Sequence, residues 1–311
     1  MKRAFLFPGQ GSQIVGMGKD IYENYEEARK IYDTASEISA INIKKLCFEG
    51  PQEKLNKTEN TQIAILTTSL AILEILKSKN IEPVVLAGLS LGEYTALIYS
   101  NMLSFEDGIK LVKKRGYCMS KFVPNEDFSM AAVIGLESAK IEEICREIRE
   151  EGKFVVPANY NYSNQTVISG NTTAIEIAME KLKEEGAKRV LKLNTSGPFH
   201  TEKLELAKNN YEKELEKLEF KKGNINVIKN IDGKIYTKKD NIKEILAKHI
   251  VSPVRFDKTI KLMQELNIEQ YVEIGPGKTL TGFVKKEIKD ANVINLNDLS
   301  SLNEFIKGVE V

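Results

Sequence analysis

Apolar residues in the N-terminal third of the chain alternate between short runs and longer helical patterns. Residues 3–7 and 84–88 form short apolar runs, and residues 61–78 are apolar nearly all round over the length of a helix. The short runs predict buried strands, and the long one predicts a helix packed inside a larger core. Helical patterns follow from about Gly92 to Leu103 and from about Phe105 to Phe122. This alternation of strand and helix predicts a parallel α/β sheet.

The middle of the chain shows two similar strand–helix–strand patterns. In each helical stretch the apolar residues recur at i, i+3, i+4 and i+7, and a glycine, Gly152 or Gly186, follows where a left-handed cap is expected. The order β-α-β-β-α-β is that of a ferredoxin-like unit. The four predicted strands are residues 130–134, 154–158, 166–169 and 189–193.

The α/β pattern returns after this unit. An amphipathic helix is predicted at residues 203–219 and a buried strand at residues 270–274. We therefore predict a large α/β domain made of residues 1–126 and 197–311, into which a small ferredoxin-like domain is inserted at residues 127–196.

The composition is that of a globular protein with balanced charge. The 311 residues are 42% hydrophobic and 29% charged, with 45 Lys and Arg against 44 Asp and Glu, so no overall field favours nucleic acid or an anionic membrane. The apolar start stops at Pro8, too early for a signal peptide, and no uninterrupted apolar run approaches a membrane span. Three widely spaced cysteines predict neither disulfides nor a zinc site. We expect a cytoplasmic monomer.

Two glycine-rich segments fail the spacing tests for phosphate binding. A dinucleotide fingerprint that starts at Gly9 requires a third glycine at position 14, where Ile14 stands. A P-loop that ends at Gly277-Lys278-Thr279 requires its first glycine at position 272, where Val272 stands. The second segment is therefore predicted to be a strand-to-helix turn, and the first a loop.

A serine stands between two glycines in Gly88-Leu89-Ser90-Leu91-Gly92, after an apolar run and before a helical pattern. A nucleophile elbow has this context, because its serine occupies a strained turn in which side chains at the flanking positions would clash. The alternative is a tight turn with a capping serine. The strand before and the helix after favour the nucleophile and make the large domain α/β-hydrolase-like.

A serine nucleophile needs a base, and the chain contains two histidines, His200 and His249. His200 lies in a loop that returns from the small domain and precedes the predicted helix at residues 203–219. It therefore follows the nucleophile along the chain, as in α/β-hydrolases. Its place near a helix N-terminus favours the neutral imidazole that a base requires, and we favour His200.

Four motifs occur in order along the chain. They are Leu6-Phe7-Pro8-Gly9-Gln10-Gly11-Ser12-Gln13, Gly88-Leu89-Ser90-Leu91-Gly92-Glu93-Tyr94, Gly197-Pro198-Phe199-His200 and Glu273-Ile274-Gly275-Pro276-Gly277-Lys278. With these motifs the sequence resembles the malonyl-CoA:acyl-carrier-protein transacylases over essentially the whole chain.

The resemblance implies a ping-pong reaction without a cofactor. Ser90 would take the malonyl group from malonyl-CoA while His200 accepts its proton, and the phosphopantetheine thiol of acyl carrier protein would then remove the group. The backbone N–H groups of Gln10 and Leu91 would form the oxyanion hole. The product would supply fatty-acid synthesis.

The resemblance also implies roles for four other residues. Arg115 matches the arginine that binds the malonyl carboxylate, for which a planar guanidinium is well suited. Phe199 matches the malonyl-selective pattern, and Asn161 lies where the family lines its pocket from the small domain. His249 stands where the family often has glutamine, and its backbone carbonyl would orient the catalytic imidazole.

Three alternatives remain open from the sequence. The GxSxG motif also fits a serine hydrolase, and the same catalytic residues fit a stand-alone polyketide acyltransferase. A non-catalytic carrier-protein-binding module is disfavoured because the set of predicted site residues is intact. Since carrier proteins are typically acidic, Lys113, Lys114 and Lys121 are predicted to contribute to a basic docking surface.

Overall fold

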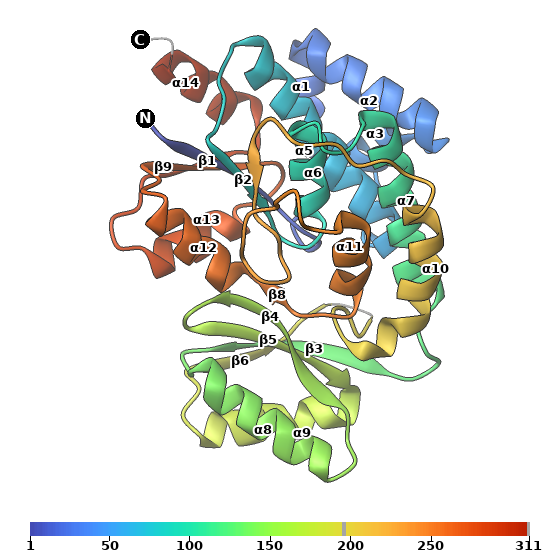
Figure 1. Cartoon of the computed structure of the whole chain (residues 1–311), viewed down its shortest axis with the longest axis vertical. Coiled ribbons are helices and arrows are strands. Elements are labelled where there is room, and N and C mark those ends of the chain that lie inside the picture. The colour runs from blue at the N-terminus through green and yellow to red at the C-terminus, as the bar shows by residue number, and fades with distance from the viewer. Residues whose placement is uncertain (195–196, 310–311) are drawn as a thin grey trace.

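The computed structural model describes residues 1–194 and 197–309 and contains two five-stranded sheets (Figure 1). In the first sheet the strands follow the order β10–β9–β1–β2–β7, and every neighbouring pair is parallel. This arrangement confirms the predicted parallel α/β sheet. The strands are β1 (Arg3–Phe7), β2 (Val85–Gly88), β7 (Asn226–Val227), β9 (Gln270–Ile274) and β10 (Val293–Leu296).

Both faces of the first sheet are buried by helices. Alternate residues of each strand point to opposite faces, so the strands contribute to two apolar clusters. On β1, Phe5 and Phe7 pack into one apolar cluster, whereas Ala4 and Leu6 pack into another. The first cluster includes residues of α2 (Glu26–Ser39), α5 (Thr58–Ser78), α6 (Gly92–Tyr99), α7 (Phe105–Lys121) and α14 (Leu299–Val309). The second includes residues of α12 (Phe256–Glu265) and α13 (Thr279–Glu287).

Helix α5 is the apolar helix that the sequence pattern predicted. Its 21 residues are long and apolar enough, by length and composition, to cross a membrane, and 83% of its most apolar window is buried inside the protein. It is therefore a core helix. Apart from α8 and α9 of the second sheet, the other helical elements are α1 (Lys19–Asn24), α3 (Ile43–Phe48), α4 (Gln52–Leu55), the 3₁₀ turn η1 (Glu202–Leu204), α10 (Glu205–Leu215) and α11 (Ile242–Ile250).

The second sheet has the strand order β6–β3–β5–β4–β8. Helices α8 (Ser138–Glu150) and α9 (Thr172–Glu184) cover its face that points away from the first sheet (Figure 1). The chain order β3-α8-β4-β5-α9-β6 confirms the predicted ferredoxin-like unit, and the capping Gly152 and Gly186 have φ angles of 82° and 96°. Its strands are β3 (Phe128–Ile134), β4 (Val155–Tyr162), β5 (Gln165–Asn171) and β6 (Arg189–Lys192).

A short strand from the C-terminal part of the chain joins the second sheet. Strand β8 (Val254–Arg255) pairs in parallel with β4, and Val254 packs in the apolar cluster that contains Ala4 and Leu6 of β1. This segment therefore contacts both sheets. Two residues are too few to give a periodic pattern, and the sequence did not predict this strand. The predicted domain boundaries at 126/127 and 196/197 stay a prediction, with residues 195 and 196 outside the described part of the chain.

Two helices differ from their predicted lengths. Helix α6 ends at Tyr99 rather than Leu103, because Asn101 adopts a left-handed φ of 61° and Ser104 caps the next helix by accepting the Asp107 N–H. The helix predicted at residues 203–219 is a 3₁₀ turn followed by α10, which ends at Leu215.

The glycine segment after β9 is the strand-to-helix turn that was predicted when the P-loop spacing failed. Gly275 has a φ of 131°, and a Cβ at that position would lie 2.3 Å from the Ser69 Oγ. The buried Glu273 carboxylate accepts the backbone N–H groups of Leu280 and Thr281, at 3.0 and 2.7 Å. The motif therefore fixes the start of α13 to the end of β9.

Candidate active site

Ser90 occupies a strained turn between β2 and α6. Its φ of 52° lies in the left-handed region, where residues other than glycine, asparagine and aspartate are uncommon. A Cβ on Gly88 would lie 2.0 Å from the Gly92 carbonyl carbon, and a Cβ on Gly92 would lie 2.1 Å from the Phe7 carbonyl oxygen. The predicted elbow is therefore present, and both flanking glycines are required by close backbone contacts.

A buried amide that the sequence analysis missed holds this turn from both sides. The Asn230 Oδ1 accepts the Ser90 backbone N–H at 2.9 Å, and its Nδ2 donates to the Gly88 carbonyl at 2.7 Å. Asn230 is 2% exposed and follows β7, whose pairing with β2 brings it to the elbow. The sequence offered only a turn-rich Asn230-Ile231-Asp232-Gly233 after a two-residue strand, which marks a loop rather than a support.

His200 contacts the serine directly. Its Nε2 lies 2.8 Å from the Ser90 Oγ, and its Nδ1 lies 2.9 Å from the His249 carbonyl oxygen. Because a carbonyl only accepts, Nδ1 carries the proton and Nε2 is left to accept the serine O–H. The structure thus pairs Ser90 with His200, and the His249 backbone holds the ring in the orientation that the resemblance implied.

The His200 imidazole is neutral near pH 7. Burial, with a smaller contribution from the positive charge of Arg115, lowers its pKa to about 4. The sequence predicts a neutral ring because of a nearby helix N-terminus, whereas burial is the main cause in the folded protein. A neutral ring with a free Nε2 can accept a proton from Ser90.

Arg115 of α7 is buried beside the same hydroxyl. Its Nη2 donates to the Ser90 Oγ at 3.0 Å and its Nη1 donates to the Gln62 Oε1 at 2.8 Å. The guanidinium lies 5.2 Å from the centre of the Tyr94 ring, and its Nε makes no hydrogen bond within the described residues. Arg115 is 1% exposed and forms no salt bridge with a described carboxylate, so it is suited to bind a substrate anion.

The two predicted oxyanion donors lie on loops that meet at the elbow. A Cβ on Gly9 would lie 2.6 Å from the Leu89 carbonyl oxygen, which places the loop containing Gln10 against the elbow. The backbone N–H groups of Gln10 and Leu91 donate no hydrogen bond to any described residue. Since Asn230 already accepts the Ser90 N–H, these two donors are the ones left to stabilise a developing negative charge.

Two other predicted site residues make no side-chain hydrogen bond to Ser90, Arg115 or His200 within the described part of the chain. Asn161 on β4 is 5% exposed and donates to the Gln165 Oε1 at 2.8 Å, and its Oδ1 has no partner in the described part of the chain. Phe199 packs into the core of the first sheet. Their substrate-binding roles stay predictions.

The predicted docking lysines lie on the exposed side of α7. Lys113 donates to the Ser39 carbonyl at 2.7 Å, and Lys114 lies 3.8 Å from a carboxylate oxygen of Glu214. A docking role for them and for Lys121 stays a prediction. No group of three or more His, Cys, Asp or Glu side chains that could hold a metal ion occurs among residues 1–194 and 197–309.

A serine in a strained turn, an imidazole 2.8 Å from its hydroxyl and two unpaired backbone donors beside a parallel α/β sheet form the arrangement that acyl-serine chemistry requires. The chain belongs to the acyl transferase domain family, whose model matches residues 4–308.

Named relatives narrow this class. The chain is 42% identical over 306 residues to the malonyl CoA-acyl carrier protein transacylase of Bacillus subtilis (strain 168), covering 98% of this chain and 96% of the relative. The enzyme of the same name from Clostridium perfringens ATCC 13124 is 43% identical in its solved structure, with a TM-score of 0.95 and coverage of 100% and 98%. A malonyl-transacylase in complex with a type II PKS acyl-carrier protein is 35% identical, with a TM-score of 0.95 and coverage of 99% and 100%.

Proposed function

We propose that this enzyme transfers the malonyl group from malonyl-CoA to the phosphopantetheine thiol of acyl carrier protein through a malonyl-Ser90 intermediate. One observation carries the proposal. The Ser90 Oγ lies 2.8 Å from the His200 Nε2 and 3.0 Å from the Arg115 Nη2, so a nucleophile, its base and a carboxylate-binding cation meet at one atom.

The first half-reaction acylates the serine. The Ser90 Oγ attacks the thioester carbonyl carbon while its proton passes to the His200 Nε2. The carbonyl oxygen becomes negative and accepts the N–H groups of Gln10 and Leu91. As the carbon–sulfur bond breaks, the CoA sulfur takes the proton from His200, which leaves malonyl-Ser90 and a neutral imidazole.

The second half-reaction runs the same steps with a different thiol. The carrier-protein thiol gives its proton to the His200 Nε2 as its sulfur attacks the Ser90 ester, and His200 then returns that proton to the Ser90 Oγ. The His249 carbonyl supports both half-reactions, because it accepts the hydrogen bond from the His200 Nδ1–H throughout and keeps Nε2 facing the serine.

Arg115 provides selection for a substrate with a carboxylate. When the malonyl carboxylate binds, the guanidinium gains a charged partner for N–H groups that are otherwise buried with neutral ones. An acetyl group has no carboxylate and leaves that cation without a charged partner. The enzyme therefore prefers malonyl over acetyl by the free energy of this interaction. Arginine is the rarer cation in this chain, at seven residues, which agrees with a specific role for Arg115.

The experiment is intact-protein mass spectrometry after mixing with malonyl-CoA and no carrier protein. A single malonyl adduct on Ser90 is expected, absent in Ser90→Ala, much reduced with acetyl-CoA or in Arg115→Ala, and discharged by carrier protein. An adduct that discharges to water as fast as to carrier protein would instead identify a serine hydrolase, and no adduct would identify a non-catalytic module.

The same assay separates two carrier-protein sources. One structural relative is bound to a type II PKS acyl-carrier protein, so a polyketide carrier protein is the second candidate partner. Faster discharge to a fatty-acid carrier protein than to a type II polyketide carrier protein is expected for an enzyme of fatty-acid synthesis. We also propose that the enzyme works as a cytoplasmic monomer without a cofactor and without nucleic-acid or membrane partners.

A further inference from the structure

A carboxyl group and a second imidazole are buried together behind His200. Glu93 of α6 and His249 of α11 are each 1% exposed, and the Glu93 Oε2 lies 3.3 Å from the His249 Nδ1. Neither ring nitrogen of His249 makes a hydrogen bond to any described residue. Because unpaired polar groups are costly in a protein interior, a proton shared with the Glu93 carboxyl group would give the His249 Nδ1 the partner that it otherwise lacks.

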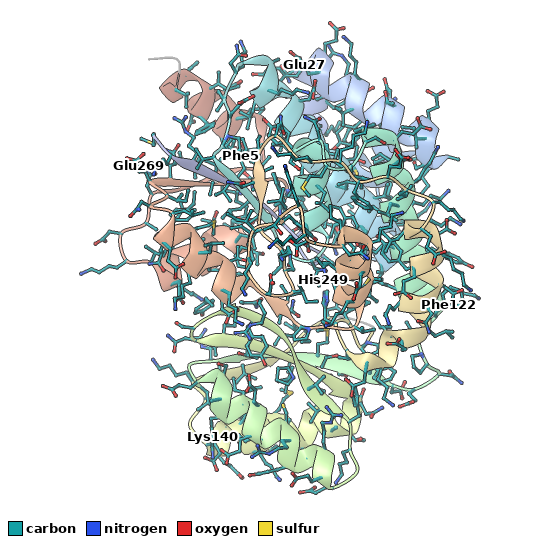
Figure 2. All side chains as sticks on the ribbon, viewed as in Figure 1. Phe5, Glu27, Phe122, Lys140, His249 and Glu269 are labelled. Atoms are coloured by element: carbon teal, nitrogen blue, oxygen red, sulfur yellow. The ribbon has the colours of Figure 1, made fainter. Side chains whose placement is uncertain are left out.

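Glu93 is linked to both the nucleophile and the base. Its Oε2 accepts the backbone N–H of Asn230 at 3.4 Å, and the Asn230 side chain holds the Ser90 turn. On the other side, the His249 ring stacks on the His200 ring, with centres 4.8 Å apart and planes 29° apart. Figure 2 labels His249 beside α11, at a height between the first sheet and the second.

We propose that Glu93 is a positioning residue for malonyl transfer, which shares one proton with His249 and stabilises the positive charge that His200 acquires during the reaction. This inference rests on the proposed function, since His200 becomes positive only if it takes the Ser90 proton. Glu93 makes no described hydrogen bond to the Ser90 hydroxyl, and it acts through the His249 ring.

The shared proton has two places. With Glu93 ionised, the His249 Nδ1–H donates to the carboxylate, and a negative charge lies one ring away from His200. With Glu93 protonated, its O–H donates to the His249 Nδ1, and that charge is absent. An imidazolium at His200 is therefore more stable when Glu93 is ionised.

The neighbouring groups leave Glu93 as the member of this cluster that titrates near neutral pH. Burial raises the pKa of Glu93 to about 7, against the hydrogen bond from the Tyr236 O–H at 2.7 Å and the charge of Arg115 on α7. Burial raises the pKa of Tyr236 and of Tyr94, so both phenols stay neutral. Burial also lowers the pKa of both histidines.

The first test is the pH profile of malonyl transfer between pH 5.5 and 8.5, for the wild type, Glu93→Gln and His249→Gln. We expect the wild-type kcat to rise about tenfold through pH 7 as Glu93 ionises. Glu93→Gln keeps the shape of the side chain and the hydrogen bond from Tyr236. Its kcat should not change with pH and should stay near the low-pH value of the wild type. His249→Gln keeps the backbone carbonyl but removes the stacked ring, so its rise should be smaller.

The second test is independent of activity. With only two histidines in the chain, protein labelled with ¹⁵N-histidine gives two imidazoles, and His249→Gln assigns them. The His249 signals should shift through pH 7 in the wild type and stay constant in Glu93→Gln, while His249 remains neutral in both.

The outcomes separate this inference from the proposed function. A wild type that transfers no malonyl group overturns the proposed function. Normal transfer with the same rising profile in Glu93→Gln overturns the inference alone, as does a His249 signal that titrates to the imidazolium form near pH 6.5 in both proteins. A structural role alone would lower the melting temperature of Glu93→Gln and leave the shape of the pH profile unchanged.

Discussion

The two sheets of this protein bury different kinds of side chain. In the second sheet and its helices the core is apolar, and its charged residues pair at the surface, as Lys140 does with Glu143 and Glu185. The first sheet and the segments around it bury ionisable groups. Among the described residues, every charged or histidine side chain that is buried lies outside β3–β6: Glu93, Arg115, His200, Lys229, His249 and Glu273.

This difference separates the part of the fold that is built for stability from the part that carries the chemistry. Exposed ion pairs such as those of Lys140, at the outer surface in Figure 2, contribute only about 0–1 kcal/mol each. Buried ionisable groups carry a desolvation penalty of several kcal/mol, which only specific partners offset. The first sheet tolerates that penalty just after the carboxyl end of β2, where Ser90, His200 and Arg115 meet.

The largest contrast is expected between two serines. Ser90→Ala should reduce malonyl transfer by about 10⁴-fold or more, because no nucleophile remains. Ser169 on β5 is fully buried and its hydroxyl has no described partner, so Ser169→Ala should leave transfer unchanged and stability equal or higher. Steady-state transfer assays and thermal melts measure both, and a large loss of transfer in Ser169→Ala would contradict the separation of the two sheets.

Two glycine substitutions, one beside each sheet, test the comparison of the two sheets through the free energy of unfolding. Gly92→Ala should lower the free energy of unfolding by at least about 3 kcal/mol, because its Cβ would overlap the Phe7 carbonyl. Gly186, unlike Gly92, has a positive φ, but a Cβ there meets nothing within 4 Å, so Gly186→Ala should lose only about 1 kcal/mol. Urea denaturation distinguishes them, and equal losses would contradict the claim that the close backbone contact at Gly92 costs more than the backbone strain at Gly186.

Glu93→Gln should raise the free energy of unfolding at the pH values at which the buried Glu93 of the wild type is ionised. The folded-state pKa of about 7 lies above the ordinary value of 4.5, so wild-type stability is lost as pH rises from 4.5 through 7. The neutral glutamine escapes this loss, and the variant should be more stable at pH 8 by on the order of 2 kcal/mol. Denaturation at pH 5 should show a much smaller gain, and a loss at pH 8 would contradict the assigned direction.

An effect of similar size is expected at Asn230. Asn230→Ala leaves the Ser90 N–H and the Gly88 carbonyl without their partner, which should lower the free energy of unfolding by about 2 kcal/mol and kcat by about tenfold. KM for malonyl-CoA should change little, because Asn230 makes no described hydrogen bond to Arg115, the residue proposed to bind the malonyl carboxylate. A raised KM with unchanged kcat would place Asn230 in substrate binding instead.

Local patterns predicted most of the fold. The ferredoxin-like order and the helix-capping glycines were readable because each strand and helix depends on neighbours a few residues away, and the elbow was readable because two glycines must flank the strained serine. Strand β8 and the end of α6 were missed, since a two-residue strand has no period and the apolar residues after Tyr99 continue past the turn at Asn101.

The sequence by itself determined which groups are available: one serine in an elbow, two histidines, and few arginines. Only the tertiary structure decided how they combine, because the contacts that matter join distant segments. His200 reaches Ser90 across 110 residues and Asn230 reaches it across 140. The same packing removes water from Glu93, Arg115 and both histidines. That burial moves the pKa of Glu93 and of both histidines away from their ordinary values, and a linear sequence does not display it.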